Sequence, residues 1–172
     1  MNRNRIRLLC ISGVLCAAVF VTTAYLHIPS HNGYIHIGDA IIYLAACLLP
    51  TPYAVLVGAG GAALADLLSG YAVWIPGTAV IKALTALCFS HRAEKVITVR
   101  NLTAMLPAAL LCIFGYYLYE SIITANFIAP LAGFVGSTIQ AVSSSVMFVV
   151  LGLAVDKLRL KEMILGGGKK LK

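Results

Sequence analysis

Apolar residues form six long runs along this 172-residue chain, separated by short polar or basic segments. A helix needs about 20 residues to cross the hydrocarbon of a bilayer, so runs of this length predict membrane-spanning helices. The second run ends at Pro50 and is short for a span, which implies a thinner bilayer or burial by neighbouring helices. A polar, flexible stretch is expected at 30–34. The six predicted helices cover residues 6–28, 36–49, 53–69, 76–89, 102–124 and 128–155. The pattern thus predicts an all-α bundle of six transmembrane helices.

Composition supports a lipid environment. The chain is 60% hydrophobic and only 11% charged, whereas a typical soluble domain is about 25% charged. This argues against a cytosolic enzyme, a nucleic-acid-binding domain and a secreted disulfide scaffold. The five cysteines lie inside apolar stretches without a CxxC pair, so they are expected to be free thiols and not metal ligands. No catalytic motif is present, and no enzyme activity or cofactor is expected.

The basic residues are confined to three places. Twelve of the thirteen lie within 3–7, 92–100 and 157–172, and Lys82 lies outside these clusters. Bases confined to termini and short connectors are typical of cytoplasmic segments of membrane proteins, not of a nucleic-acid-binding surface. We therefore expect a six-helix transmembrane domain at 1–156, followed by a basic cytoplasmic tail.

Six crossings would place both ends of the chain on one side of the membrane. The connector at 90–101 would face the same side, together with all twelve clustered bases. The opposite loops, near Asn32, Tyr71 and Asn126, contain no Lys or Arg. The charge pattern therefore predicts a multi-pass protein of the cell membrane with cytoplasmic termini.

Several ionisable side chains lie within or at the edge of predicted helices, in the half away from the clustered bases. They are Asp39, Asp66, Lys82 and Glu120. Such residues are costly in hydrocarbon and usually face a bundle interior or a wet cavity. Polar groups that converge with aromatic side chains in an apolar bundle predict a pocket for a small, ring-containing solute. The candidate binding residues are Asp39, Asp66, Tyr71, Trp74, Lys82, Tyr116, Glu120 and Gln140.

Structural interpretations of the same residues stay open at this point. Asp66 and Lys82 could form a buried pair that only holds helices together. Asp39 could cap the start of the second helix, and the aromatic residues Tyr71 and Trp74 could belong to an interfacial belt. The three acids and one base sum to a charge of −2 if all are ionised, which favours an amine-bearing or weakly cationic solute.

Small residues in the first helix occur at a spacing that permits close helix contact. Gly13 and Ala17 form one such pair, and Ser12 and Cys16 form another. Either pair can serve packing within the chain or provide a docking face for another membrane protein. Small residues also surround most of the third helix at 58–66 and predict close packing there.

Two stretches resemble a known family. Residues 35–46 (IHIGDAIIYLAA) and 58–76, followed by Lys82, resemble the substrate-binding (S) components of energy-coupling-factor (ECF) transporters. The similarity is to the branch with riboflavin-, pyridoxine- and hydroxymethylpyrimidine-type members. It implies a six-helix protein that captures a small heterocyclic vitamin or nucleobase-like precursor at its extracellular side. Pyridoxine-like, pyrimidine-like and queuosine-precursor-like solutes all remain open.

The resemblance also implies partners. An S component docks on a transmembrane coupling subunit that carries two ATPases, and then topples to release its solute inward. Gly13 and Ala17 occupy the place of the family's docking motif, where paired alanines are common. The alternatives are a self-sufficient channel or secondary carrier, and a membrane scaffold without a solute.

Overall fold

The computed structural model describes residues 3–30 and 33–165. Nearly all of this part of the chain is helical, and two short strands form one hairpin. The elements are α1 (Arg3–Ala24), β1 (His27–Ser30), β2 (Gly33–His36), α2 (Gly38–Leu48), α3 (Thr51–Leu68), the 3₁₀ helix η1 (Ala72–Trp74), α4 (Ile75–Leu87), α5 (Val99–Thr124), the 3₁₀ helix η2 (Ala129–Ala132), α6 (Gly133–Lys157) and α7 (Leu160–Leu165).

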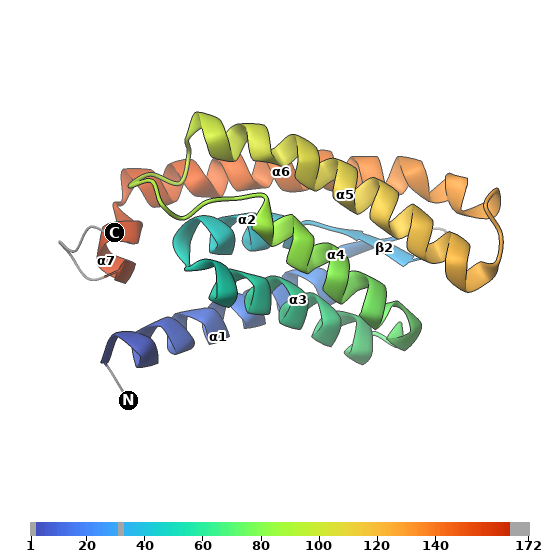
Figure 1. Ribbon diagram of the computed structural model, residues 1–172, viewed down its shortest axis with the longest axis horizontal. Helices are drawn as coiled ribbons and strands as arrows, with labels where there is room; N and C mark the ends of the chain where they lie inside the picture. Colours follow the sequence, from blue (N-terminus) through green and yellow to red (C-terminus); the bar gives the residue numbers. More distant parts are fainter. Residues whose placement is uncertain (1–2, 31–32, 166–172) are drawn as a thin grey trace.

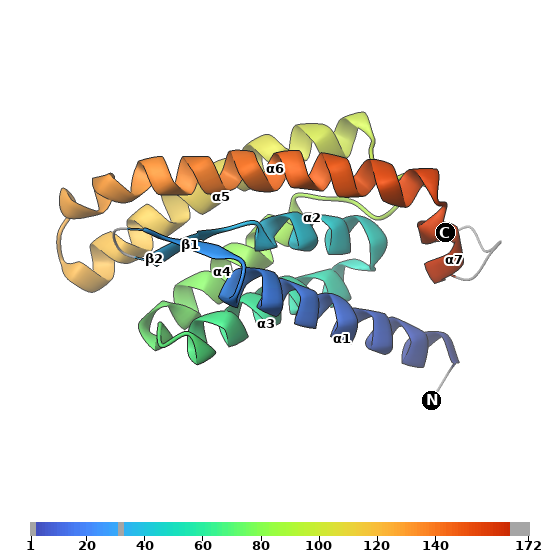
Figure 2. The same ribbon diagram turned by 180° about the vertical axis from the view of Figure 1, so that it is seen from behind.

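The helices form an elongated bundle whose two ends differ in charge. The start of α1, the helix α7 and the connector between α4 and α5 lie at one end, which we call the basic end (Figure 1). The α3–α4 and α5–α6 turns lie at the other end, which we call the far end. The same arrangement is visible from behind, where α6 and α1 lie on opposite sides of α2 (Figure 2). The folded chain thus brings the described members of the three basic clusters to one end.

Helix lengths separate the six predicted segments into two groups. Within the described residues, four helices are long and apolar enough to cross a membrane: α1, α3, α5 and α6. The helix α2 and the combined segment of η1 and α4 are apolar but shorter. The interior position of α2 accounts for its short length, because all of its residues except Ile41 are buried by neighbouring helices.

The distribution of polarity differs from that of a water-soluble protein. Charged and polar side chains such as Asp39, Lys82 and Ser144 are completely buried, while large apolar side chains are exposed along α1, α5 and α6. Extensive exposed apolar surface marks contact with lipid or with another protein. The exposed surface therefore agrees with the lipid environment predicted from composition.

The segment between the first two helices differs from the prediction. The first helix ends at Ala24 and does not reach residue 28, and the stretch expected to be flexible contributes to a hairpin. In this antiparallel pair His27 faces His36 and Ser30 faces Gly33. Pairing gives the backbone groups hydrogen-bond partners near the apolar bundle, where unpaired groups are costly. The predicted loop residues His31 and Asn32 lie outside the described residues.

Small residues allow α1 and α4 to approach α3 closely from two sides. A Cβ atom on Gly61 would lie 2.8 Å from the Cys16 carbonyl oxygen and 2.8 Å from Val19 Cβ, so α1 packs directly on this glycine. A Cβ atom on Gly58 would lie 3.3 Å from the Lys82 carbonyl oxygen of α4. The close packing predicted for the third helix is therefore confirmed.

Polar side chains of α6 and α7 anchor the connector at the basic end. The Asp156 carboxylate accepts hydrogen bonds from the backbone of Val96 and Ile97, at 2.7 and 2.9 Å. Lys161 of α7 donates to the carbonyl oxygens of Cys47, His91 and Ala93, at 2.6 to 2.9 Å. The boundary expected at 156/157 falls at the end of α6, and the beginning of the predicted tail packs back on the bundle. Its remaining residues, 166–172, lie outside the described part of the chain.

Candidate functional site

Four helices contribute to a polar cluster inside the apolar bundle. Asp39 lies in the first turn of α2, and its Oδ1 atom lies 2.7 Å from Lys82 Nζ of α4. Gln140 of α6 donates from Nε2 to Asp39 Oδ2 at 3.0 Å. Cys112 of α5 has its Sγ atom 3.6 Å from Lys82 Nζ and 3.7 Å from Asp39 Oδ2. The side chains of Asp39 and Lys82 are both 0% exposed, so the pair is sealed within the fold.

The surroundings of Asp39 explain how a charge is tolerated there. Two buried charges offset their loss of hydration only when they are paired and additional hydrogen bonds satisfy their remaining atoms. Lys82 provides the pairing and Gln140 one such hydrogen bond. The N-terminus of α2 adds a favourable dipole, because carboxylates are stabilised in the first turn of a helix.

The geometry tests two of the structural alternatives separately. The N-cap position of α2 is Ile37, and the helix start has no side-chain capping hydrogen bond, so Asp39 does not act as a cap. Among the described residues, the ion pair of Lys82 is with Asp39 and not with Asp66. The alternative of a helix-linking pair therefore applies to Asp39, an acid on a different helix from the expected one.

Aromatic side chains connect this cluster to the far end. Lys82 Nζ lies 5.1 Å from the ring centroid of Tyr116, a cation–π distance. The Tyr116 hydroxyl donates to Thr78 Oγ1 at 3.4 Å. The ring of Trp74 lies 6.1 Å from that of Tyr116, between ring centroids. Trp74, Tyr116 and Lys82 therefore form a continuous path from η1 into the bundle.

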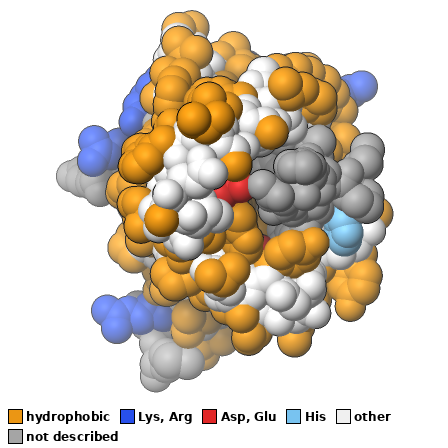
Figure 3. Space-filling view, turned by 90° about the vertical axis from the view of Figure 1, so that its right-hand side faces the viewer, with side chains coloured by type: hydrophobic (Ala, Val, Ile, Leu, Met, Phe, Trp, Pro, Cys, Tyr) orange, Lys and Arg blue, Asp and Glu red, His pale blue; other side chains and the backbone are white. Residues whose placement is uncertain are grey.

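The remaining predicted residues lie nearer the far end. Asp66 and Glu120 are 6% and 7% exposed, at the last turns of α3 and α5. The backbone nitrogen of Tyr71 donates to the Asp66 carbonyl oxygen at 2.8 Å. Seen end-on, the far end shows an acidic side chain near its centre, with Lys and Arg only at the periphery (Figure 3). Asp39, Lys82, Tyr116 and Gln140 are thus in direct contact with one another through Asp39 or Lys82. Asp66 and Glu120 lie nearer the far end than this cluster.

Sequence reasoning missed two members of the cluster. The sequence predicts only a free thiol at Cys112, although its spacing of four residues from Tyr116 puts both on one helix face. His36 begins the predicted second helix and is not among the candidate binding residues, but its ring is buried and its Nδ1 accepts a hydrogen bond from the Gly38 nitrogen at 3.0 Å. Ser144 of α6 donates to the His36 carbonyl oxygen at 3.4 Å. Thus β2 is tied to α2 and α6 beside Asp39.

The two small-residue pairs of α1 point in different directions. Ser12 and Cys16 are partly buried, and Cys16 packs against α3 near Gly61. Gly13 and Ala17 are exposed, and a Cβ atom on Gly13 would meet nothing within 4 Å. Packing within the chain therefore accounts for the first pair, and the second is left on the outer surface.

Comparisons with known proteins support one family. A model of the family described as "ECF-type riboflavin transporter, S component" matches residues 3–157. No curated protein matches the chain. A solved structure described as "Structure and mechanism of the S component of a bacterial ECF transporter" aligns with a TM-score of 0.69 and 18% sequence identity, covering 90% of this chain and 98% of that one. This likeness shows a shared fold. The family match covers nearly the whole chain, which therefore belongs to the S components, the substrate-binding subunits of ECF-type transporters, and is a transport subunit rather than an enzyme.

Proposed function

We propose that the far end of the bundle captures a small heterocyclic vitamin or nucleobase-like precursor at the extracellular side of the cell membrane. A transmembrane coupling subunit with two ATPases then drives inward delivery. The observation that carries this proposal is the buried Asp39–Lys82–Gln140 cluster, which aromatic rings connect to the far end, away from the described basic residues of the three clusters. Ionisable groups inside a membrane bundle commonly mark a solute or ion pathway, so this cluster supports a binding site beside it.

The proposed topology has six crossings, with both termini in the cytoplasm. Its support is the charge asymmetry, because Lys and Arg near the ends of spans favour the cytoplasmic side. The short α2 would cross as an interior helix, since its neighbours shield it from lipid. The segment of η1 and α4 would cross with its Pro76 end toward the outside.

The candidate residues would take different roles in binding. Asp39 and Lys82 are completely buried, so they would hold α2 and α4 in position beneath the solute. Tyr116 and Trp74 would stack on its ring, because flat apolar surfaces suit heterocycles. Hydrogen bonds would come from the polar residues around this ring site, namely Asp66, Tyr71, Glu120 and Gln140.

Charge at the proposed site favours a solute with donor groups. Asp39 and Lys82 neutralise each other, which leaves Asp66 and Glu120 as the acids of the far half. Acidic groups that line one region attract positively charged or hydrogen-bond-donating solutes through their combined field. We therefore expect amine-bearing heterocycles to be preferred over acidic ones.

Docking of the coupling subunit would use the exposed Gly13–Ala17 face of α1. Exposed small residues let another helix approach the backbone closely. Replacing Ala17 with Phe should reduce co-purification with the coupling subunit. The matched control is Val142→Phe, at an exposed position of α6, which should leave co-purification unchanged.

Thermal stabilisation of the detergent-purified protein tests the solute proposal. The panel contains riboflavin, pyridoxine, a hydroxymethylpyrimidine and a deazapurine queuosine precursor, and one of them should raise the melting temperature in proportion to the logarithm of its concentration. Glu120→Gln should weaken binding of an amine-bearing ligand, and the exposed-site variant Val146→Leu should not. A panel without any response would contradict the proposal.

Proteoliposomes separate this function from the alternatives. An S component should move solute only when the coupling subunit and ATPases are reconstituted with it. Solute flux by the chain alone would support a channel or secondary carrier instead. A scaffold role would be indicated if Lys82 and Glu120 variants bind partners normally and no solute is found.

A further inference from the structure

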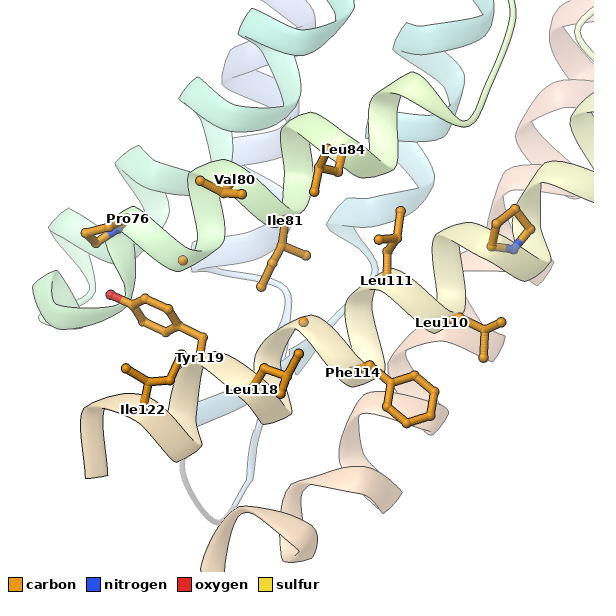
Figure 4. Close-up of a pocket in the computed structure, with 13 residues that line it drawn as sticks. Pro76, Val80, Ile81, Leu84, Leu110, Leu111, Phe114, Leu118, Tyr119 and Ile122 are labelled. Carbon is orange, nitrogen blue, oxygen red and sulfur yellow. The ribbon is translucent and has the colours of Figure 1, made fainter. Parts of the chain in front are cut away.

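A long apolar groove runs along the outer surface between α4 and α5 (Figure 4). It has a volume of about 780 Å³. Val80 and Leu84 form one wall, and Leu110, Phe114 and Leu118 form the other. These side chains are 44–60% exposed, so the groove opens away from the bundle interior and is separate from the polar cluster.

The groove follows from how α4 and α5 approach each other. At Gly77 the helices touch, since a Cβ atom there would lie 2.5 Å from the Tyr119 ring. At Gly115 a Cβ atom would lie 2.9 Å from Ile81 Cγ1. The helices meet at both glycines, which form part of the groove floor, and the larger lining residues on either side border the furrow. Pro107, inside α5, lines the groove toward the basic end.

The lining restricts the chemistry of an occupant. All lining residues are apolar except Tyr119, whose hydroxyl already donates to the Val73 carbonyl oxygen at 2.7 Å. A polar solute would lose its hydration here without gaining partners. The groove therefore suits hydrocarbon, on a surface that faces lipid in a membrane protein.

The length of the groove fits one leaflet. Its lining runs from Pro76 to Leu84 on α4 and from Pro107 to Ile122 on α5, which correspond to about 12 and 22 Å at 1.5 Å per residue. Half of a hydrocarbon core about 30 Å thick is about 15 Å. Both walls are present only over the shorter length of about 12 Å, so the two-walled part of the groove fits within one leaflet and begins at the far end.

We propose that this groove binds an acyl chain of a phospholipid from the leaflet at the far end, which is the outer leaflet in the proposed topology. The bound chain fills the furrow over Gly77 and Gly115 and packs on Ile81 and Leu111. Ile81 and Leu111 are the sequence neighbours of Lys82 and Cys112. The acyl chain therefore packs on the outer side of the two helices, α4 and α5, whose inner side carries these members of the polar cluster.

Electron spin resonance with spin-labelled phosphatidylcholine tests this inference. The protein is reconstituted in phosphatidylcholine vesicles, and the motionally restricted lipids per protein are counted. Val80→Trp fills the groove and should reduce the count by about one. The control is Val146→Trp on α6, which has the same 60% exposure and should leave the count unchanged.

A second variant and a second measurement complete the test. Leu110→Trp fills the opposite wall and should give the same loss, and native mass spectrometry should show one fewer retained phospholipid for both groove variants. Equal counts in the wild type and both groove variants would overturn the proposal. Unchanged lipid counts with lost assembly onto the coupling subunit would also overturn it, because the groove would then belong to a protein partner.

Discussion

Removing the positive charge from the buried pair gives the sharpest prediction. In Lys82→Met the apolar stem is retained, but Asp39 stays buried at 0% exposure. Its remaining described partners are the Gln140 amide at 3.0 Å and the Cys112 thiol at 3.7 Å, and neither carries a compensating charge. Breaking a buried ion pair from one side costs about 3–5 kcal/mol of unfolding free energy.

The double variant provides the decisive comparison. Asp39→Leu combined with Lys82→Met removes both charges and leaves side chains of similar size. Replacing a buried pair by apolar groups is often neutral or stabilising, so the double variant should be more stable than either single one. We expect a coupling free energy of at least about 2 kcal/mol between the positions, within the range for residues in direct contact.

Stability can be measured by SDS titration and by thermal unfolding with a thiol-reactive dye. The dye is suitable because Cys47 and Cys112 are free and buried. For a chain of this size, 3–5 kcal/mol corresponds to a fall of roughly 6–20 °C in melting temperature. Leu84→Met on the same helix is the control and should change stability little. Small, additive losses below 1 kcal/mol in both single variants would refute the reasoning.

Three further predictions concern the basic end and α1. Lys161→Met should cost at least about 1.5–3 kcal/mol in SDS titrations, because three carbonyl oxygens lose a charged donor; a loss under about 0.5 kcal/mol would contradict this. Burial, with the positive charges of Lys161 and Arg92, lowers the pKa of His91 below 6.5. The unfolded state then binds more protons in acid than the folded state, so the free energy of unfolding should fall as the pH drops below 6.5. Thermal scans should show a smaller fall for His91→Gln. Parallel pH profiles for the two proteins would exclude a contribution of His91 to the acid sensitivity. Gly61→Val should lower the free energy of unfolding by about 1–3 kcal/mol, because its side chain overpacks the contact with α1. Gly13→Val, in open space, is the control and should leave the melting temperature unchanged. Equal melting temperatures for the two variants would show that the α1–α3 contact is not tight.

Much of the architecture could be predicted because hydrocarbon restricts composition so strongly. A long apolar run has few alternatives to a helix in lipid, and charge is tolerated mainly at the ends or in the interior. These restrictions were enough to predict six helical segments. They also predicted which half of the bundle contains Asp39, Lys82 and Glu120. The hairpin could not be predicted, because His27–Ser30 and Gly33–His36 are four residues each and carry little periodic signal.

The partner of Lys82 could not be chosen from the sequence. Asp39, Asp66 and Glu120 lie at similar predicted depths, and depth says nothing about rotation around the bundle axis. Only the packing of α2 in the interior sets the 2.7 Å contact with Asp39. Rotation also separates the small-residue pairs of α1, since adjacent residues point about 100° apart on a helix of 3.6 residues per turn.

The sequence by itself determined that the chain is a helical membrane protein, that twelve of its thirteen basic residues belong to one side, and that Asp39, Lys82 and Glu120 belong to the other half. These properties follow from the low solubility of charge in hydrocarbon, which acts on each segment separately. Only the tertiary structure decided that Asp39 pairs with Lys82, that Gly13 and not Cys16 faces outward, and that α4 and α5 enclose a groove. Each of these depends on how helices rotate and cross to fill space, which is a property of the packed bundle.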